Sequence, residues 1–408
     1  MKLGLVAFSD FQRYPVGGTL SFLREFIIAA SDIADVEISL VGWSSTPIRQ
    51  TEVRGIRVGT REHSFIAVGG GIPPRVIPDR TVFHANSNGW REAMSLLGHV
   101  DTLYCHSPEA VLGAVRGGAR SPIAMHLHGA RDAIGRSRFL VGRLPPVKWL
   151  YRHLVLEPAL LRADAVLATI SEDEHRKLQA SGLVRAGVPC VRIPGMVSSK
   201  LGESRPKSPG GAIRMVCVGR IESVKGIELP IAALAVLVQR GIKCHLDIVG
   251  GGADQKRLER LVRERGLAGF VTFCGRLEPD EVARYLGAAD VFVSGSLQEG
   301  FSLALLEALV VGTPAVVTMV GSARDVIVTG STGEVVSGRD PERFADAVQS
   351  VARYSGDCSR ACHEMAMCYS SRRISGQVLE ILEEISHRPA GTSTPPPDPV
   401  VSTAGVGL

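Results

Sequence analysis

The chain has 408 residues, of which 45% are hydrophobic and 21% are charged, a composition typical of a globular protein with two or three domains. The net charge of +5 is uneven: residues 1–205 carry 25 Lys and Arg against 18 Asp and Glu, whereas residues 206–408 carry 21 against 23. Only 5% of the residues are aromatic, and we see no nucleic-acid-binding motif. We therefore expect no nucleic-acid partner.

The N-terminus and the cysteines indicate a cytoplasmic protein. The apolar start of the chain is interrupted at Ser9 and Asp10, too soon for a signal peptide, and no run approaches the ~18 apolar residues of a membrane span. The eight cysteines include no CxxC pair, so reduced thiols are favoured over disulfides or a zinc site. A peripheral position at the inner membrane face is left open.

In the first half, buried strands are predicted at 3–8, 36–43, 81–85, 101–105, 123–128 and 165–170, with helices between most of them. A helix is expected from about Thr19, after a polar loop that ends at Gly17-Gly18. The acids after Ser171 suggest a metal site, but Ser171 with Glu174 fits a helix capping box better.

The second half begins a new α/β unit after the linker at 198–211. Strands are predicted at 213–218, 244–249, 271–274, 290–293 and 315–318. Helices are predicted at 226–239, 254–265, 279–287, 301–311, 340–353 and 374–386. Strands and helices that alternate in this way predict α/β architecture, and two such halves predict a ligand cleft between them.

The stretch from Ser294 to Gly312 runs from the end of a strand through a polar loop into a helix. In an open parallel sheet, phosphorylated ligands bind at such a place. Glu299 lies in the loop and Glu307 lies eight residues later, a little over two helical turns away. The two cannot form the close carboxylate pair of a glycosidase, so they indicate two separate anchors along a polyhydroxy ligand.

A second candidate site follows the strand at 213–218. Arg220 can donate two hydrogen bonds to phosphate oxygens, and Lys225 adds a point charge. We expect the segment from Gly219 to Gly226 to open a helix. Val249-Gly-Gly-Gly252 lacks the dinucleotide fingerprint and the P-loop lysine, so neither hydride transfer nor ATP hydrolysis is supported.

These motifs stand in the order and spacing of a known family. In the second half they are Gly219-Arg220, Lys225-Gly226, Ile248 to Gly251, Phe273 to Gly275, Tyr285, Ala289-Asp290, Glu299 to Phe301, Glu307-Ala308, Gly312 to Pro314, Val320-Gly321 and Thr332-Gly333. Together they resemble the nucleotide-sugar domain of retaining glycosyltransferase family 4, among the glycosyl transferases group 1. The first half resembles this family more loosely, through Gly17-Gly18, His126 to Gly129 and Ile170 to Glu172.

The resemblance implies a GT-B fold, in which two Rossmann-like α/β domains face an interdomain cleft. It implies an acceptor-side domain over 1–197, the linker at 198–211 and a nucleotide-sugar-binding domain over 212–372. A C-terminal helix over 373–387 would cross back to the first domain, and the tail at 388–408 is expected to be disordered.

The resemblance also implies roles for single residues. Arg220 and Lys225 would neutralise the donor diphosphate, which backbone N–H groups at Gly17 and Gly18 approach from the other domain. Glu307 would hold the ribose hydroxyls. The groups nearest the transferred sugar would be the catalytic His128 and Glu299, with backbone N–H groups of Gly300, Phe301 and Ser302. His126 is a weaker candidate on the same face of its strand.

The implied reaction moves a hexose from a nucleoside-diphosphate sugar to an acceptor hydroxyl, with retention of the anomeric configuration. The donor would be a UDP- or GDP-sugar, and the acceptor a carbohydrate, a lipid-linked sugar or a small metabolite. We expect no cofactor and no metal. The alternatives are a nucleotide-sugar epimerase or hydrolase of the same fold, and a non-catalytic sugar-nucleotide-binding protein. One departure is Ile193 to Ser198, which lacks the Asn and Asp that are usual there.

A basic stretch at 131–152 suggests an acceptor or membrane contact, because apolar residues interleave with its cations. A solvated loop and helix explains the pattern equally well. The candidate cations are Arg136, Arg138, Arg143 and Lys148.

Overall fold

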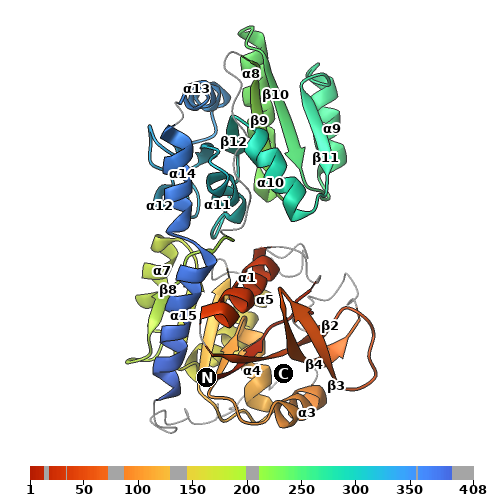
Figure 1. Ribbon diagram of the computed structural model, residues 1–408, viewed down its shortest axis with the longest axis vertical. Helices are drawn as coiled ribbons and strands as arrows, with labels where there is room; N and C mark the ends of the chain where they lie inside the picture. Colours follow the sequence, from red (N-terminus) through yellow and green to blue (C-terminus); the bar gives the residue numbers. More distant parts are fainter. Residues whose placement is uncertain are drawn as a thin grey trace, which may run out of the picture.

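The computed structural model describes residues 1–12, 18–33, 35–71, 87–128, 145–198, 211–354 and 357–387. They form two α/β domains, each built on its own sheet with helices on both faces (Figure 1). Of the predicted features, the strand at 81–85, nearly all of the linker and the tail at 388–408 lie outside the described residues.

The first domain contains an eight-stranded sheet in the order β3-β4-β2-β1-β5-β6-β7-β8. All neighbours are parallel except β3 and β4, which form an antiparallel pair at one edge. The strands are β1 (Lys2–Val6), β2 (Glu37–Ser44), β3 (Glu52–Val58), β4 (Arg61–Gly70), β5 (Thr102–Cys105), β6 (Ile123–His128), β7 (Ala165–Thr169) and β8 (Cys190–Arg192). Strand order reverses at β1, between β2 and β5, the kind of switch point at which such sheets bind ligands.

Helices cover both faces of this sheet, because the buried strands have no polar face. One face of the sheet packs on α1 (Gly18–Ile33), and the opposite face packs on four other helices. The latter are α3 (Ser87–Leu97), α4 (Pro108–Arg116), α6 (Glu157–Arg162) and α7 (Glu172–Gln179). Helix α5 (Pro145–Tyr151) leads into α6 through a π-helical turn, η2 (Arg152–Leu156).

The second domain contains a six-stranded parallel sheet in the order β11-β10-β9-β12-β13-β14, which reverses at β9. Its strands are β9 (Ile213–Val218), β10 (Cys244–Val249), β11 (Val271–Gly275), β12 (Val291–Ser294), β13 (Ala315–Thr318) and β14 (Gly333–Val336). The helices on one face are α8 (Glu228–Gln239), α9 (Gln255–Glu264) and α13 (Pro341–Val351). Those on the other face are α10 (Pro279–Ala288), α11 (Leu303–Val310), α12 (Ala323–Val326) and α14 (Asp357–Met367).

The last described helix, α15 (Ser371–Ser386), belongs by contact to the first domain. It lies beside α1 (Figure 1), and its apolar residues join the core beneath α1. The Thr102 hydroxyl donates to the Leu382 carbonyl over 3.1 Å. The chain thus leaves the first domain once and returns to it through one helix.

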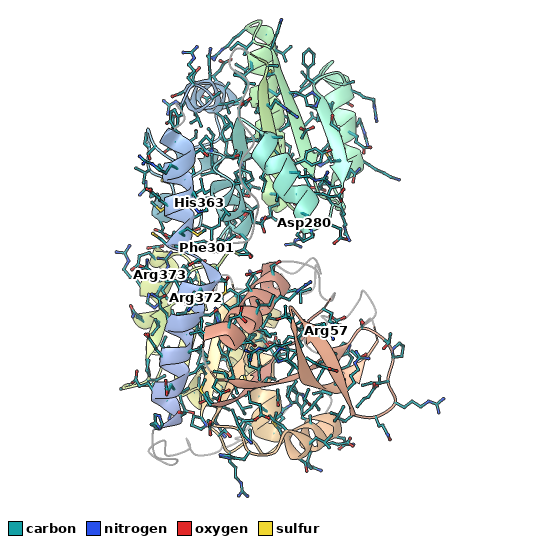
Figure 2. All side chains as sticks on the ribbon, in the orientation of Figure 1. Arg57, Asp280, Phe301, His363, Arg372 and Arg373 are labelled. Atoms are coloured by element: carbon teal, nitrogen blue, oxygen red, sulfur yellow. The ribbon has the colours of Figure 1, made fainter. Side chains whose placement is uncertain are left out.

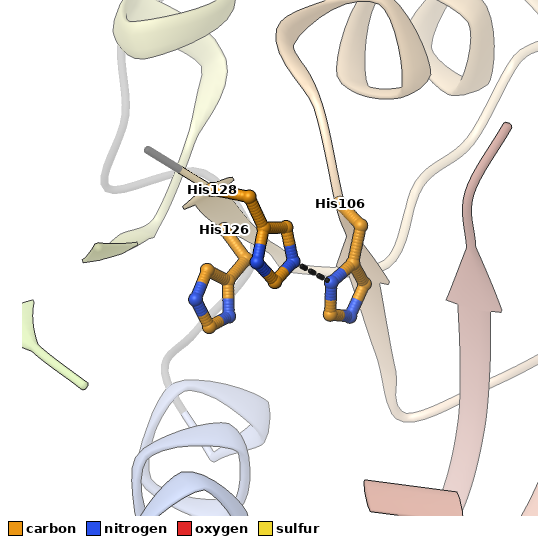
Figure 3. Close-up of side chains that lie close together, drawn as sticks. All are labelled: His106, His126 and His128. Atoms are coloured by element: carbon orange, nitrogen blue, oxygen red, sulfur yellow. Dashed lines mark hydrogen bonds between the residues drawn. The ribbon is translucent and has the colours of Figure 1, made fainter. Parts of the chain in front are cut away.

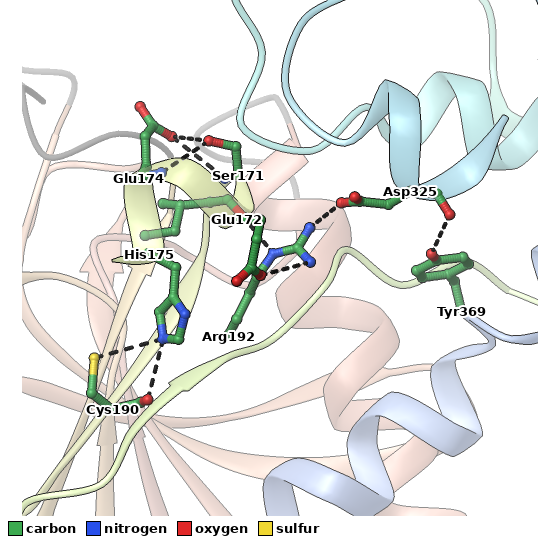
Figure 4. Close-up of polar contacts among 9 residues, drawn as sticks. Ser171, Glu172, Glu174, His175, Cys190, Arg192, Asp325 and Tyr369 are labelled. Atoms are coloured by element: carbon green, nitrogen blue, oxygen red, sulfur yellow. Dashed lines mark hydrogen bonds and ion pairs between the residues drawn. The ribbon is translucent and has the colours of Figure 1, made fainter. Parts of the chain in front are cut away.

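A polar contact also joins the two domains, close to the start of α15. Arg192, at the end of β8, pairs with Asp325 on α12 of the second domain (Figure 4). The backbone carbonyl of Asp325 accepts a hydrogen bond from the Tyr369 hydroxyl at 3.0 Å. Side chains of both domains therefore meet on the same side of the molecule as the chain crossing.

Local predictions can be compared with these elements. The capping box of Ser171 and Glu174 is confirmed at the start of α7, which leaves no need for a metal there (Figure 4). The helix predicted at 226–239 is confirmed as α8, which begins at Glu228 and ends at Gln239. The segment from Gly219 to Gly226 is not α-helical: it contains a short 3-10 turn, η3 (Ser223–Lys225), and Gly226 is left-handed with φ 53°. No helix among the described residues is long and apolar enough to cross a membrane.

We expect Leu382→Ala to weaken the first domain, because this side chain is fully buried between α15 and the first sheet. The cavity should cost about 2–5 kcal/mol of unfolding free energy, which a lower urea midpoint would report. Glu380→Ala, at an exposed position of the same helix, is the control and should change stability by less than about 0.5 kcal/mol. Equal midpoints for the two variants would contradict the packing of α15.

Candidate functional site

Two loops of the second domain meet at the carboxyl edge of its sheet, where β9 and β12 end. Lys225 follows β9, and Glu299 follows β12. The Lys225 Nζ lies 2.6 Å from Glu299 Oε1, which also accepts a hydrogen bond from the Ser296 hydroxyl at 2.8 Å. The Glu299 side chain is only 14% exposed, so this is a partly buried ion pair. These groups and Ser302 line one pocket at the switch point of the sheet.

The close approach of the two loops depends on glycine. A Cβ at Gly226 would lie 2.1 Å from the Gly295 carbonyl oxygen, and the positive φ of Gly226 also disfavours any other residue. Arg339 links the two loops, because its guanidinium donates one hydrogen bond to the Gly295 carbonyl at 2.5 Å and another to the Gly226 carbonyl at 3.4 Å. Arg339 was not predicted as a site residue, because it follows β14 and belongs to none of the motifs.

Arg220 lies beside the same pocket and is exposed. Its Nη1 donates to Glu222 Oε1 at 2.9 Å. The guanidinium is thus at the surface of the pocket, whereas the Lys225 ammonium lies deeper, with 25% of its side chain exposed.

The segment predicted to donate backbone N–H groups leads directly into α11. Ser302 is the N-cap of this helix, and its hydroxyl accepts from the Leu305 N–H at 3.4 Å. The Phe301 side chain packs on Tyr369, with ring centroids 5.5 Å apart, and lies where the two domains meet (Figure 2). We assign this ring a packing role. Gly300 precedes Phe301 in the loop that ends at the helix, whose N-terminal end carries positive partial charge.

Helix α1 of the first domain meets α11 across the domain boundary. A Cβ at Gly18, the first residue of α1, would lie 3.6 Å from Leu303 Cδ1, so the two helix starts are neighbours. Farther along, Glu25 of α1 is close enough to Glu307 of α11 to influence its ionisation. Burial and the Glu25 charge raise the pKa of Glu307 to about 7. An acidic and a glycine residue of the first domain therefore lie near α11 of the second.

Three histidines gather at the carboxyl edge of the first sheet. His106 follows β5, and both His126 and His128 end β6 (Figure 3). His106 Nδ1 lies 2.7 Å from His128 Nε2. The rings of His126 and His128 stack with centroids 4.2 Å apart and planes 4° apart. Phe22 of α1 packs edge-on against His126 and His128, at 4.9 Å and 5.0 Å.

His126 is an interior residue. It is fully buried, with Nδ1 2.5 Å from the Tyr104 hydroxyl and Nε2 2.8 Å from the Thr169 hydroxyl. Burial, followed by the neighbouring histidines, holds its pKa well below the usual range. Both nitrogens are engaged inside the core, so its role as a weaker catalytic candidate loses support, and His128 remains the partly exposed histidine of the strand end.

The same three rings offer nitrogens within 4.8 Å of one another, a spacing that a metal ion can use. Their orientation does not favour one. The rings are nearly parallel, with planes 4° to 18° apart, so lone pairs in the ring planes do not converge on one point. Both His126 nitrogens also have hydroxyl partners. We interpret the cluster as a hydrogen-bonded stack.

Other predicted residues are not brought into this site by the described structure. Lys148 lies on α5, among exposed side chains. Gly17, Arg136, Arg138 and Arg143 lie outside the described residues.

Comparison with known proteins assigns the second domain. Residues 203–364 match the family model described as glycosyl transferases group 1. Among curated proteins, the chain is 30% identical over 184 residues to the D-inositol 3-phosphate glycosyltransferase of Corynebacterium urealyticum, covering 42% of this chain and 43% of that protein. It is 27% identical over 243 residues to the alpha-D-kanosaminyltransferase of Streptomyces kanamyceticus, covering 56% and 60%. The matched segments thus span about half the length of these relatives.

Solved structures resemble the whole chain. The sucrose-phosphate synthase of Thermosynechococcus elongatus superposes with a TM-score of 0.76 at 20% identity, covering 94% of this chain and 99% of that one. HepE of Anabaena, in complex with UDP and glucose, superposes with a TM-score of 0.64 at 18% identity over the same shares. These similarities confirm the predicted GT-B fold of two Rossmann-like domains. The second domain thus resembles the glycosyl transferases group 1, as its motifs predicted, and the two-domain fold extends over nearly all of the chain.

Proposed function

We propose that this protein is a retaining glycosyltransferase that moves a hexose-type sugar from a nucleoside-diphosphate sugar to an acceptor hydroxyl. The observation that carries the proposal is the partly buried pair of Lys225 and Glu299, which lines a pocket with Arg220 at the switch point of the second sheet. A cation suits the diphosphate, and a carboxylate suits the sugar hydroxyls.

Lys225 can bind the donor diphosphate and Glu299 at the same time. An ammonium has three N–H donors, and Glu299 accepts one of them. The others can point to diphosphate oxygens, where negative charge grows as the glycosidic bond breaks. The ion pair also fixes the Glu299 carboxylate, which the Ser296 hydroxyl holds from the other side. Both charges are thus oriented before substrate binds, as electrostatic catalysis requires.

We also propose that no metal takes part. Among the described residues that line the pocket, Glu299 is the one carboxylate, and it is bound to Lys225. Hard divalent cations prefer several carboxylate, carbonyl or water oxygens. Lys225 and Arg220 supply the positive charge that such an ion would bring.

The first test is donor breakdown. The purified protein would be given UDP-, GDP- and dTDP-sugars, with and without a crude acceptor extract and with EDTA throughout, and released nucleoside diphosphate would be measured. We expect turnover of one donor only when the extract is present. Glu299→Gln should reduce the rate about 10–100-fold, the loss expected for a hydrogen bond to a charged group. Glu342→Gln, which removes an exposed partner of Arg240 remote from the pocket, should leave the rate unchanged.

Other outcomes of that assay would overturn the proposal. Conversion of the donor without acceptor would indicate an epimerase or hydrolase. Tight nucleotide binding without turnover under any extract would indicate a sugar-nucleotide-binding protein. Loss of activity in EDTA that Mg²⁺ or Mn²⁺ restores would contradict the metal-independent reaction.

Glu307 should make nucleotide binding depend on pH, if it holds the ribose. Its pKa of about 7 means that the carboxylate, which accepts two ribose hydrogen bonds, is lost as the pH falls below neutrality. Affinity for the nucleoside diphosphate, measured by calorimetry, should therefore fall between pH 8 and pH 6. Glu307→Gln should remove this step, and Glu25→Gln should move it to lower pH. An identical pH dependence in all three proteins would contradict the assignment.

The effect of Glu307 on stability has the opposite direction. Because its folded pKa is about 7 and its ordinary value is 4.5, the folded state binds the extra proton between these values. Stability should thus fall as the pH rises from about 4.5 to 7. Glu307→Gln should raise the melting temperature at pH 8 and leave it nearly unchanged at pH 4.

We further propose that α5 and η2 contact an anionic membrane surface, where a lipid-linked acceptor would be found. The segment exposes Trp149 by 62% and Leu154 by 59%, next to the basic side chains of Lys148 and Arg152. Exposed apolar residues beside cations are typical of helices that lie in a membrane interface.

Fluorescence offers a specific test, because Trp43 and Trp90 are buried and Trp149 is exposed. Vesicles with anionic lipid should shift the tryptophan emission to the blue and sediment the protein, whereas zwitterionic vesicles should not. Leu154→Ser should weaken this binding. Leu96→Ser, at an equally apolar but distant surface position that is 50% exposed, should not. Binding to neither vesicle would rule out this contact.

A further inference from the structure

We infer that His106 holds His128 as the Nδ1–H tautomer, so that His128 presents an N–H donor, and not a proton-accepting lone pair, on the side away from His106. His106 is then a positioning residue for the proposed transferase. The tautomer is inferred from geometry alone, whereas its role in catalysis rests on the proposed function.

The starting point is the hydrogen bond between the two rings. His106 Nδ1 and His128 Nε2 are 2.7 Å apart, so one nitrogen carries the proton and the other accepts it (Figure 3). If His106 donates, His128 accepts at Nε2 and its own proton must sit on Nδ1. If His106 accepts, His128 carries its proton on Nε2. The second nitrogen of His106 decides between these arrangements.

That second nitrogen, His106 Nε2, is buried and has no hydrogen-bond partner among the described residues. If His106 accepted at Nδ1, its proton would sit on Nε2 as a buried N–H without an acceptor. Buried N–H groups without partners are rare, and unsatisfied acceptors are better tolerated. The favourable arrangement leaves a bare lone pair on Nε2 and places the His106 proton on Nδ1, where it is donated to His128.

His63 has the same pattern of contacts, and its hydrogen bond can have only one direction. Its Nδ1 lies 3.3 Å from the Ile38 carbonyl oxygen, and its Nε2 is also buried with no partner in the described part of the chain. A carbonyl oxygen can only accept, so His63 Nδ1 must donate and Nε2 must be the bare nitrogen. This chain thus already contains a buried histidine whose unpaired Nε2 is an acceptor.

The surroundings of His106 keep this arrangement in place. The side chain is 3% exposed, and its ring packs edge-on against Tyr104 with centroids 4.2 Å apart. The ring of Phe22 lies 6.0 Å away. Burial is the main cause that holds the pKa of His106 well below its usual range, and repulsion between the two rings, were both protonated, lowers it further, so His106 stays neutral at physiological pH. A neutral, enclosed imidazole is a fixed donor with one N–H.

The consequence concerns the role of His128. It ends β6 at the carboxyl edge of the first sheet, one strand from the switch point at β1 and β5. As the Nδ1–H tautomer, it can donate to an oxygen that gains negative charge, such as a leaving phosphate or a sugar hydroxyl. It cannot remove the acceptor proton at Nδ1, so the proton of the acceptor hydroxyl must go elsewhere, for example to the departing phosphate.

Nitrogen-15 NMR of the full chain with labelled histidine reports the tautomer directly, without substrate. Long-range correlations at pH 7.5 should show His128 and His63 with the proton on Nδ1 and a bare Nε2. Signals are assigned by their loss in His128→Gln and His63→Gln. A proton on Nε2 of His128, or a doubly protonated ring, would overturn the inference whether or not the protein proves to be a transferase.

Two near-isosteric variants then test the direction of the bond. His106→Asn keeps an N–H donor near the Nδ1 position and should retain the His128 tautomer and at least about a third of the donor turnover. His106→Asp offers only an acceptor and should shift the His128 proton to Nε2, with turnover lowered more than tenfold at unchanged KM. His106→Leu, which does neither, should give a mixture of tautomers. His63→Asn is the control for disturbing a buried histidine, and thermal melts identify any variant that fails to fold.

The three His106 variants give distinct outcomes. The same His128 pattern in Asn, Asp and Leu variants would show that His106 does not set the tautomer. A changed tautomer with unchanged turnover would remove the positioning role and leave the proposed function standing. Absence of turnover in the unaltered chain would challenge the proposed function but not the tautomer, which the NMR spectrum settles on its own.

Discussion

The packing of α15 against α1 is the contact that ties the two domains together. Helix α1 lies at the boundary between them: Gly18 at its start lies near Leu303 of the second domain, Phe22 packs on the histidine stack, and Glu25 influences Glu307. Because α15 comes from the C-terminal end of the described chain and packs on α1, the chain that leaves the second domain is held against the helix that lies near α11. A change in the packing of α1 should therefore disturb both the histidine stack and the surroundings of Glu307.

In each domain, the strand order of the sheet brings polar side chains together at one edge. Strand order reverses at β1 in the first sheet and at β9 in the second, so loops after neighbouring strands diverge there and leave room for a ligand. In the second sheet, two loops approach so closely that only glycine fits at 226, and Arg339 bonds their carbonyls together. The cationic group and the carboxylate are thereby fixed on separate strands but held at hydrogen-bond distance.

The sequence predicted the fold class because its strands are short, continuous apolar runs, and the motif residues stand at the ends of those runs. It also placed Lys225, Glu299 and Glu307 on the correct loops and helix. It placed the start of α8 slightly too early, at residue 226, because a left-handed Gly226 ends a 3-10 turn before α8 begins at Glu228. The strands β8 and β14 were not predicted, because they are short and only partly buried and so give no continuous apolar run.

Arg339 and His106 were missed for a different reason: their roles come from tertiary contacts. His106 meets His128 only because β5 and β6 are neighbours in the sheet, and strand order is not written in any local motif. One signal was available, since His106 follows an apolar strand as His128 ends one, and parallel strands bring such ends together. In the proposed transferase, the pocket of the second domain would bind the diphosphate through full charges, Lys225 and Arg220. The histidine stack of the first domain would act through neutral rings, whose protons we infer to be placed by their neighbours.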